Sequence, residues 1–401
     1  MSTATPPVCS KLFGLFCLAS YLLSLSYGST FLLSLLIGSR GGNEQDAGSV
    51  ISAAMLSTFA AVIGSGHLSD WLGAARSVAL FGLLLVAASL GFALTPGFGH
   101  LLLLFGLLLG LGWGVFYTLG PIIVASLVTP AQRAKYFALL SGSMMTGIGS
   151  GPLLGRAASA LGYPVTAAFY LAALASFMGV LLFWRLGRQL KTAPAQSTVV
   201  SRISWHAAAR VLSSRAVFPI IMVGLGGCVF GGLSSFQTSY AAQRSLDYSL
   251  FFLGFMSAAI SGRLLIAGVV VKRDPLRASC LLSGLMLGSI LMFGFMVNDG
   301  FSYVLAAVML GIGYGLTYSV INGLAANEAP SGTTAQSLLL FSLSYFIGVF
   351  GFPLLAGKII VEHGMATLLL TVMAVASLNW LITVGRLTWR RITAVKALQR
   401  A

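Results

Sequence analysis

The run LLLLFGLLLGL at 101–111 decides the class of fold, because none of its side chains carries a charge or a hydrogen-bonding group. The rest of the chain continues this composition: 57% of the 401 residues are hydrophobic and only 8% are charged. A soluble domain is about a quarter charged, and a disordered chain is far less apolar, so both classes are excluded. Long unbroken apolar runs predict membrane-spanning helices, since the strands of a membrane barrel alternate apolar and polar residues.

Segments of about 20 residues, enough to cross a bilayer as a helix, recur along the chain. We predict six in the first half, near 12–37, 47–68, 77–95, 101–128, 134–158 and 164–186. We predict six more near 216–240, 249–271, 278–297, 301–327, 334–359 and 366–388. The predicted fold is an all-α polytopic membrane protein with 12 transmembrane helices in two pseudo-symmetric six-helix bundles. The predicted boundaries are 1–187 for the N-terminal bundle, 188–215 for a basic cytoplasmic linker and 216–401 for the C-terminal bundle.

The net charge of +15 has a topological explanation. With both termini inside, 18 of the 23 basic residues fall in cytoplasmic segments, as basic residues of membrane proteins do. We therefore predict a multi-pass protein of a bacterial cytoplasmic (inner) membrane, in contact with lipid and not with nucleic acid. The four cysteines are far apart in sequence and show no metal-ligand spacing, so we expect free thiols and no bound metal.

A shift of 201 residues aligns unusual positions of the two halves. LGLGWG at 109–114 meets LGIGYG at 310–315, PLL at 152–154 meets PLL at 353–355, and Asp46 meets Asp247. Six spans in each half make both halves enter the membrane from the same side, so the repeat is parallel. Transporters built from such repeats hold their substrate near the midplane between the halves.

The segment between the second and third spans reads GHLSDWLGAAR at 66–76. It resembles the signature loop of the major facilitator superfamily, G-x-L-x-D-x-x-G followed by basic residues. The matching residues are Gly66, Leu68, Asp70, Gly73 and Arg76. The resemblance extends over nearly the whole chain and implies alternating access, with Asp70 as a latch of the cytoplasmic gate; the alternative is a helix-capping carboxylate. In the second half, Gly268 and Lys272 stand near the positions of Gly66 and Asp70, which predicts a weak or absent second latch.

The fifth span carries a second motif, G-x-x-x-G-P-x-x-G. It resembles, in part, the antiporter motif of exporters in the superfamily, and its residues are Gly147, Gly151, Pro152 and Gly155. Small residues four apart allow close helix approach, and the proline removes a backbone donor and bends the helix. The motif favours efflux, and ordinary tight helix packing is the alternative.

Charged residues are scarce inside the predicted spans. None of the eight acids falls in the middle of a span, which makes a strongly cationic substrate less favoured than a neutral, zwitterionic or anionic one. Asp46 and Asp247 begin spans at the outer face, as helix caps or as titrating residues that could couple transport to protons. Arg263 lies within a span, where it either faces the substrate cavity or snorkels towards the cytoplasm.

Aromatic residues with polar tips recur on the spans that the repeat aligns. They are predicted to line a cavity for an amphipathic organic ligand, the alternative being packing or lipid contact. Together with Arg263, the predicted substrate-binding residues are Tyr27, Trp113, Tyr117, Phe236, Gln237, Tyr314, Tyr318, Asn322 and Tyr345.

No catalytic constellation or nucleotide-binding loop is visible, so we expect no enzyme, no cofactor and no direct use of ATP. We predict a monomeric secondary-active exporter of a small amphipathic organic compound, such as a drug-like molecule or a secreted metabolite including a metallophore, driven by an ion gradient. The alternatives are an importer or uniporter of an organic anion and a sensor with the same fold that binds ligand without transporting it.

Overall fold

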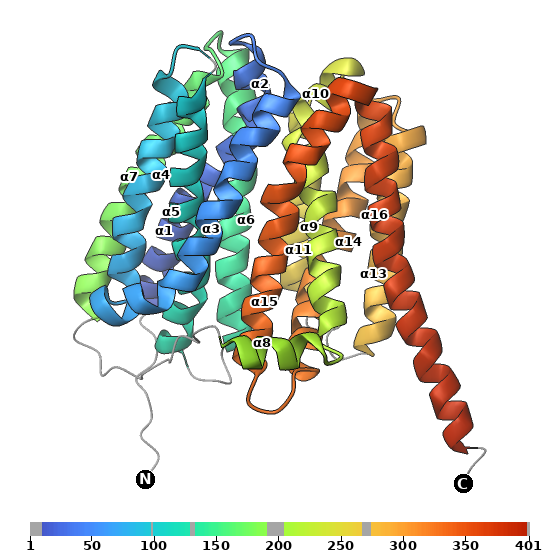
Figure 1. Cartoon of the computed structure of the whole chain (residues 1–401). Coiled ribbons are helices and arrows are strands. Elements are labelled where there is room, and N and C mark those ends of the chain that lie inside the picture. The colour runs from blue at the N-terminus through green and yellow to red at the C-terminus, as the bar shows by residue number, and fades with distance from the viewer. Residues whose placement is uncertain (1–9, 98, 129–132, 191–203, 267–273, 399–401) are drawn as a thin grey trace. The chain divides into compact units, whose positions relative to one another are not determined.

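The computed structural model describes residues 10–97, 99–128, 133–190, 204–266 and 274–398 (Figure 1). The chain divides into two compact units, Met1–Arg202 and Ile203–Ala401. Among the described residues, ten helices are long and apolar enough to cross a membrane. All twelve predicted spans overlap helical segments, and the predicted fold class is confirmed.

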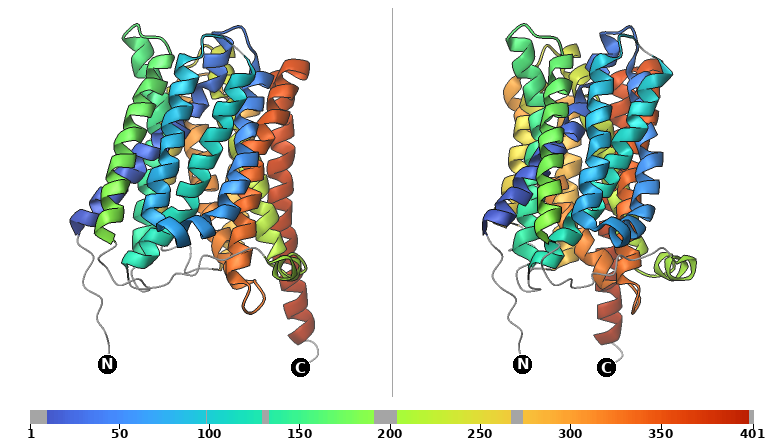
Figure 2. Two further views of the ribbon diagram at one scale, coloured as in Figure 1. Left: turned by 60° about the vertical axis from the view of Figure 1, so that its left-hand side comes forward. Right: turned by 90° about the vertical axis from the view of Figure 1, so that its left-hand side faces the viewer.

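The first unit consists of helices joined by short turns in its described part. Its elements in order are α1 (Ser10–Ser29), the 3-10 turn η1 (Thr30–Leu32), α2 (Leu33–Gly38), α3 (Glu44–Leu72), α4 (Ala74–Leu94), α5 (His100–Leu127), α6 (Arg133–Ala160) and α7 (Thr166–Leu190). Helix α1 packs on α6 and α7, and α4 packs on α5 and α7 (Figure 2).

The second unit repeats this arrangement, but two π-turns and one break in a helix interrupt it. Its elements are α8 (Trp205–Leu212), α9 (Val217–Ser235), α10 (Gln237–Gln243), α11 (Ser249–Ser261), the π-turn η2 (Gly262–Ile266), α13 (Pro275–Phe295), α14 (Gly300–Asn327), α15 (Thr334–Phe346), the π-turn η3 (Ile347–Gly351) and α16 (Phe352–Leu398). Helix α16 holds the end of the eleventh predicted span and the whole of the twelfth, which meet at a kink at Gly364 (φ 84°).

Two predicted spans are broken rather than continuous. The first is interrupted by η1, and the seventh breaks at Phe236, whose φ and ψ of −118° and 20° are not helical. Helix α8 lies within the segment predicted to be a linker, and it packs on α15. The linker residues 191–203 and the segment 267–273, which holds Gly268 and Lys272, lie outside the described residues.

The sequence repeat corresponds to repeated packing. A Cβ atom at Gly112 would lie 2.8 Å from the carbonyl oxygen of Phe81, and one at Gly313 would lie 3.0 Å from that of Leu282. Both the glycines and their partners are 201 residues apart. The same close helix contact therefore occurs once in each unit, where only a glycine leaves room for the neighbouring backbone.

Candidate functional site

Each unit contains a stack of two aromatic rings, of which one ring, that of Trp113 or Tyr314, occupies a position that the 201-residue repeat aligns. In the first unit Tyr27 of α1 stacks on Trp113 of α5, with ring centroids 4.7 Å apart and planes inclined by 22°. In the second unit Phe230 of α9 stacks on Tyr314 of α14 at 5.0 Å and 10°. All four side chains are buried. The predicted residues Tyr27 and Trp113 are thus brought together, and Tyr314 has a partner, Phe230, that the sequence analysis did not name.

Tyr117 extends the first stack, with its ring centroid 6.2 Å from that of Trp113. It is half-buried, one turn further along α5. Such a graded set of rings, buried at one end and partly exposed at the other, can hold a planar apolar group by stacking.

Arg263 is buried in the π-turn η2, with 9% of its surface exposed. Its Nε donates to the carbonyl oxygen of Gly315 at 3.2 Å, and its Cζ lies 5.7 Å from the ring centroid of Tyr318. Both partners belong to α14, so the guanidinium is held against that helix and does not snorkel to water. Among the described residues it is the only charged side chain that is buried.

Aromatic residues of α15 continue from this arginine. The ring of Tyr318 lies 5.4 Å from those of Tyr345 and Phe341, both edge-on. Asn322, one turn beyond Tyr318, is half-buried. The structure therefore gathers Arg263, Tyr318 and Tyr345 into one cluster, in which a guanidinium with five donors adjoins aromatic faces. Such a cluster can bind an anionic group attached to an aromatic or aliphatic body.

Gln237 belongs to a different cluster, at the break between α9 and α10. Its Oε1 accepts a hydrogen bond from the Tyr303 hydroxyl at 2.7 Å, and Tyr303 stacks on Tyr240 with centroids 5.9 Å apart. Gln237 is fully buried, and its Nε2 has no partner within the part of the chain that the structure describes. Phe236, at the break itself, is buried as well. Tyr303 carried no signal in the sequence, because its aromatic neighbours come from other helices.

The signature motif is mostly helical rather than a loop. Helix α3 continues to Leu72, so Gly66 and Asp70 lie on it, and the turn into α4 consists of Gly73 alone. Gly73 has φ 82° and ψ 147°, a backbone conformation that residues with a Cβ atom rarely adopt. The Ser77 hydroxyl braces the turn through the carbonyl oxygens of Leu68 and Gly73, both at 3.0 Å.

The two charged residues of this motif differ in exposure. Asp70 is exposed near the end of α3, and Arg76 is half-buried on α4. The aliphatic part of Arg76 crosses α7 at Gly187, where a Cβ would lie 2.8 Å from Arg76 Cγ.

The glycines of the second motif lie where α6 crosses α1. A Cβ at Gly147 would lie 2.8 Å from Ser24 Cβ, and one at Gly151 would lie 2.5 Å from the backbone nitrogen of Ser29. Gly155 similarly meets Leu32 of η1 at 2.5 Å. Pro152 sits inside α6 in this contact region. The glycines of this motif therefore permit close packing of α6 on α1 and η1, as the alternative interpretation of the motif predicted.

The two candidate coupling acids stabilise helix starts. Asp46 is the third residue of α3 in a capping box: its Oδ2 accepts from the Asn43 backbone nitrogen at 2.9 Å, and its own backbone nitrogen donates to Asn43 Oδ1 at 3.1 Å. Asn43, and not Asp46, is therefore the N-cap. The Oδ1 of Asp247 accepts from the backbone nitrogen and hydroxyl of Ser249 at 3.0 and 2.7 Å. Tyr248 is the N-cap of α11, so Asp247 precedes it.

Two ion pairs of the second unit were missed by sequence analysis. Arg386 of α16 binds both carboxylate oxygens of Glu328 at 2.5 and 2.7 Å and lies over the Phe218 ring. Arg390, one turn further, binds both carboxylate oxygens of Asp274. The hydrogen bond from Arg390 is the main reason why the pKa of Asp274 lies below its usual range. These pairs tie α16 to the end of α14 and to the start of α13.

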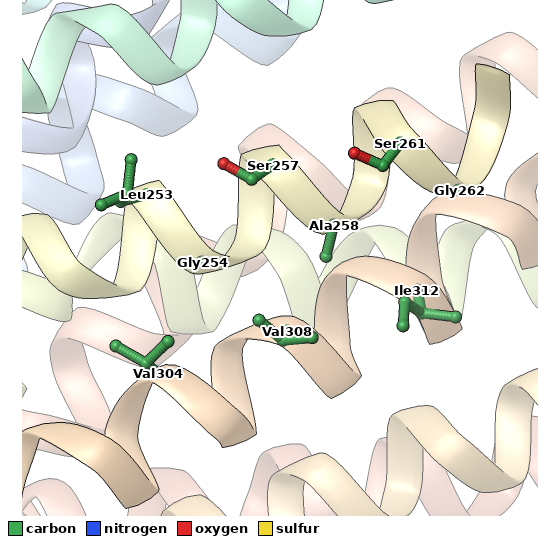
Figure 3. Close-up of a pocket in the computed structure, with 9 residues that line it drawn as sticks. All are labelled: Leu253, Gly254, Ser257, Ala258, Ser261, Gly262, Val304, Val308 and Ile312. Atoms are coloured by element: carbon green, nitrogen blue, oxygen red, sulfur yellow. The ribbon is translucent and has the colours of Figure 1, made fainter. Parts of the chain in front are cut away.

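A shallow groove of about 360 Å³ runs between α11 and α14 (Figure 3). Ala258 points towards Val308 and Ile312, whereas Ser257 and Ser261 point away from α14. None of the predicted substrate-binding residues lines this groove. Its lining residues are Leu253, Gly254, Ser257, Ala258, Ser261, Gly262, Val304, Val308 and Ile312.

Groups of three or more metal-ligating side chains do not occur within the described ranges. In that part of the chain Cys17, Cys228 and Cys280 are free thiols; Cys9 lies outside it.

Solved structures of two transporters resemble this chain in fold. The human organic anion transporter MFSD10 (TETRAN) matches with a TM-score of 0.71 and 16% identity, over 94% of this chain and 100% of that one. A mutant form of a peptide transporter, POT, matches with a TM-score of 0.75 and 18% identity, over 96% of this chain and 95% of that one. No curated protein matches in sequence. The Major Facilitator Superfamily matches residues 13–353, and the chain belongs to that family.

Proposed function

We propose that this secondary transporter exports a small amphipathic organic compound that carries an anionic group. Membership of the family makes the chain a multi-pass membrane transporter of small molecules and not an enzyme. The observation that carries the proposal is the cluster of Arg263, Tyr318 and Tyr345. A buried guanidinium next to aromatic rings suits an anion with an apolar body, because the guanidinium carries a permanent charge and several donors and the rings offer apolar faces.

Further features support the substrate class. All eight acids lie at helix ends or beside the kink at Gly364, so the described helix interiors offer a cation no buried carboxylate. The ring stacks of Tyr27 with Trp113 and of Phe230 with Tyr314 supply flat apolar surfaces. Tyr117, Phe236, Gln237 and Asn322 complete the proposed set of contacts. One of the transporters of similar fold is an organic anion transporter.

Export is favoured by the partial antiporter motif at Gly147, Gly151, Pro152 and Gly155. We place the protein in a bacterial inner membrane as a monomer, with both termini in the cytoplasm, because 18 of its 23 basic residues then face inwards. Asp70, supported by Gly66, Gly73 and Arg76, serves as the latch of the cytoplasmic gate. An ion gradient drives transport, and Asp46 and Asp247 are the acids that could bind the coupling proton.

Import of the same anion is the second candidate, because Arg263 would bind an anion moving in either direction. Metabolite profiling of cells and medium, with and without the protein, separates the two. A compound enriched in the medium only when the protein is made supports export. A compound drained from the medium supports import and overturns the interpretation of the antiporter motif.

The site is tested with Arg263→Gln in proteoliposomes loaded with the anion so identified. A hydrogen bond to a charged group contributes about 1.5–3 kcal/mol, so we expect transport of the anion to fall by about 10- to 150-fold. Transport of its neutral methyl ester should change little. Arg277→Gln is the matched control, because Arg277 is an exposed arginine of the same unit. Equal transport by Arg263→Gln and the wild type would refute the anion site.

The latch is tested separately with Asp70→Asn. We expect this variant to bind the anion as the wild type does but to transport it at least tenfold more slowly, since only the gate is affected. Unchanged transport would remove Asp70 from the mechanism and leave the anion site standing.

A further inference from the structure

Helix α8 carries one broad apolar stripe, and only part of it is packed against the protein. Ala208 and Val211 are buried towards α15. Trp205 and Leu212, two turns apart and so on one face, are 85% and 48% exposed. A tryptophan exposed to this degree in water is unfavourable, and the residue is enriched where protein meets the membrane interface.

The position of α8 suits a helix that lies at the boundary between membrane and water. Figure 1 shows it lying across the ends of α9 and α15 in the second unit. Arg210 of α8 donates to the carbonyl oxygen of Ser331, in the turn between α14 and α15, at 3.1 Å. The backbone nitrogen of Ser204, at its N-cap, donates to Gln336 Oε1 at 3.3 Å. These bonds and the buried face hold α8 at the level where the spans end.

This end of the second unit is strongly basic. The side chains described there include six arginines and two acids, and both acids are already paired with arginines of α16. The arginines are Arg210, Arg215, Arg277, Arg386, Arg390 and Arg391. Trp389 on α16, at the same end, is 67% exposed. Excess positive charge beside exposed tryptophan and leucine complements an anionic lipid surface.

We propose that α8 is an interfacial helix that inserts Trp205 and Leu212 into the headgroup region of the bilayer, while Arg210 and Arg215 bind phosphates of anionic phospholipids. The lipid surface is preferred over an acidic protein partner because the helix lies where the spans of its own unit meet the membrane boundary. The bonds to Ser331 and Gln336 would then connect the lipid headgroups to the start of α15.

The test uses the full chain in nanodiscs and measures the emission of Trp205 as the difference between the wild type and Trp205→Phe. Phospholipids brominated near the start of the acyl chain should quench most of this emission, and iodide in the water should quench little. The difference between the wild type and Trp113→Phe is the control, because Trp113 is buried and should respond to neither quencher. The double variant Trp205→Phe/Leu212→Trp moves the reporter along the same face and should behave as Trp205 does.

The lipid preference is tested with brominated phosphatidylglycerol against brominated phosphatidylcholine. A basic residue near the surface strengthens attraction to anionic lipid by about fivefold, so the preference should be at least that large and should largely vanish in Arg210→Gln/Arg215→Gln. The control is Lys358→Gln, which removes a basic residue of α16 close to the Gly364 kink. This variant should retain the preference for phosphatidylglycerol. Quenching of Trp205 by iodide and not by bromolipid overturns the proposal. Equal quenching by the two lipids overturns its anionic part, and binding of free phosphate without lipid selectivity does the same.

Discussion

Adding one methyl group at Gly151 should weaken the contact between α6 and α1. A Cβ there would lie 2.5 Å from the backbone nitrogen of Ser29 and would overlap the backbone of Gly28, whereas ordinary contacts begin near 3.4 Å. Backbone atoms cannot rotate away, so the two helices must separate. Overpacking of this kind costs about 1–3 kcal/mol.

Gly142→Ala is the matched control, because it lies on the same helix and no atom falls within 4 Å of the added carbon. Alanine is a better helix former than glycine by about 1 kcal/mol, and both variants receive this gain. The difference between them therefore isolates the overpacking. For a unit of this size, about 2 kcal/mol corresponds to a difference of roughly 4–8 °C in melting temperature. Thermal unfolding in one detergent should show Gly151→Ala melting below Gly142→Ala; equal melting would refute the packing argument.

The remaining predictions concern the ends of helices. Glu328→Gln should destabilise the protein by about 2 kcal/mol in denaturant unfolding, because it leaves Arg386 half-buried without its carboxylate; removing both partners should restore part of the loss, and no recovery would argue against a pairwise interaction. The pKa of Asp274 is depressed by Arg390, so this pair stabilises the fold at neutral pH and its contribution is lost as the pH falls through that lowered pKa. Melting temperatures of Asp274→Asn and the wild type should therefore converge only in strong acid; convergence already at pH 6 would contradict the pairing. Gly73→Ala should cost about 1–3 kcal/mol through backbone strain, and a variant as stable as the wild type would show that the turn can adopt another conformation.

The class of fold was predictable because membrane spans are encoded locally. An apolar run such as 101–111 cannot face water, and the 201-residue repeat adds a long-range constraint that composition alone lacks. The prediction of family membership is confirmed by the match over residues 13–353. The signal for the Asn43 cap was also present, since Asn followed three residues later by an acid is a capping-box pattern.

The pairings across helices were not predictable. Glu328 and Arg386 are 58 residues apart, and nothing in either segment identifies the other as its partner. Tyr303 and Gln237 are likewise far apart in sequence, 66 residues, and only the folded structure brings them together. The helical character of α8 was hidden by its short length within a polar segment.

The repeated glycine contacts show that one architectural plan serves both halves, while their chemistry has diverged. Position 62 is a valine in the first half, and its counterpart 201 residues later is Arg263. The first half is thus a largely apolar frame at the place where the second half carries a charge. At this pair of positions the two halves share a fold, and only the second half carries a buried positive charge. Substitutions at equivalent positions should accordingly have unequal consequences for the selection of cargo.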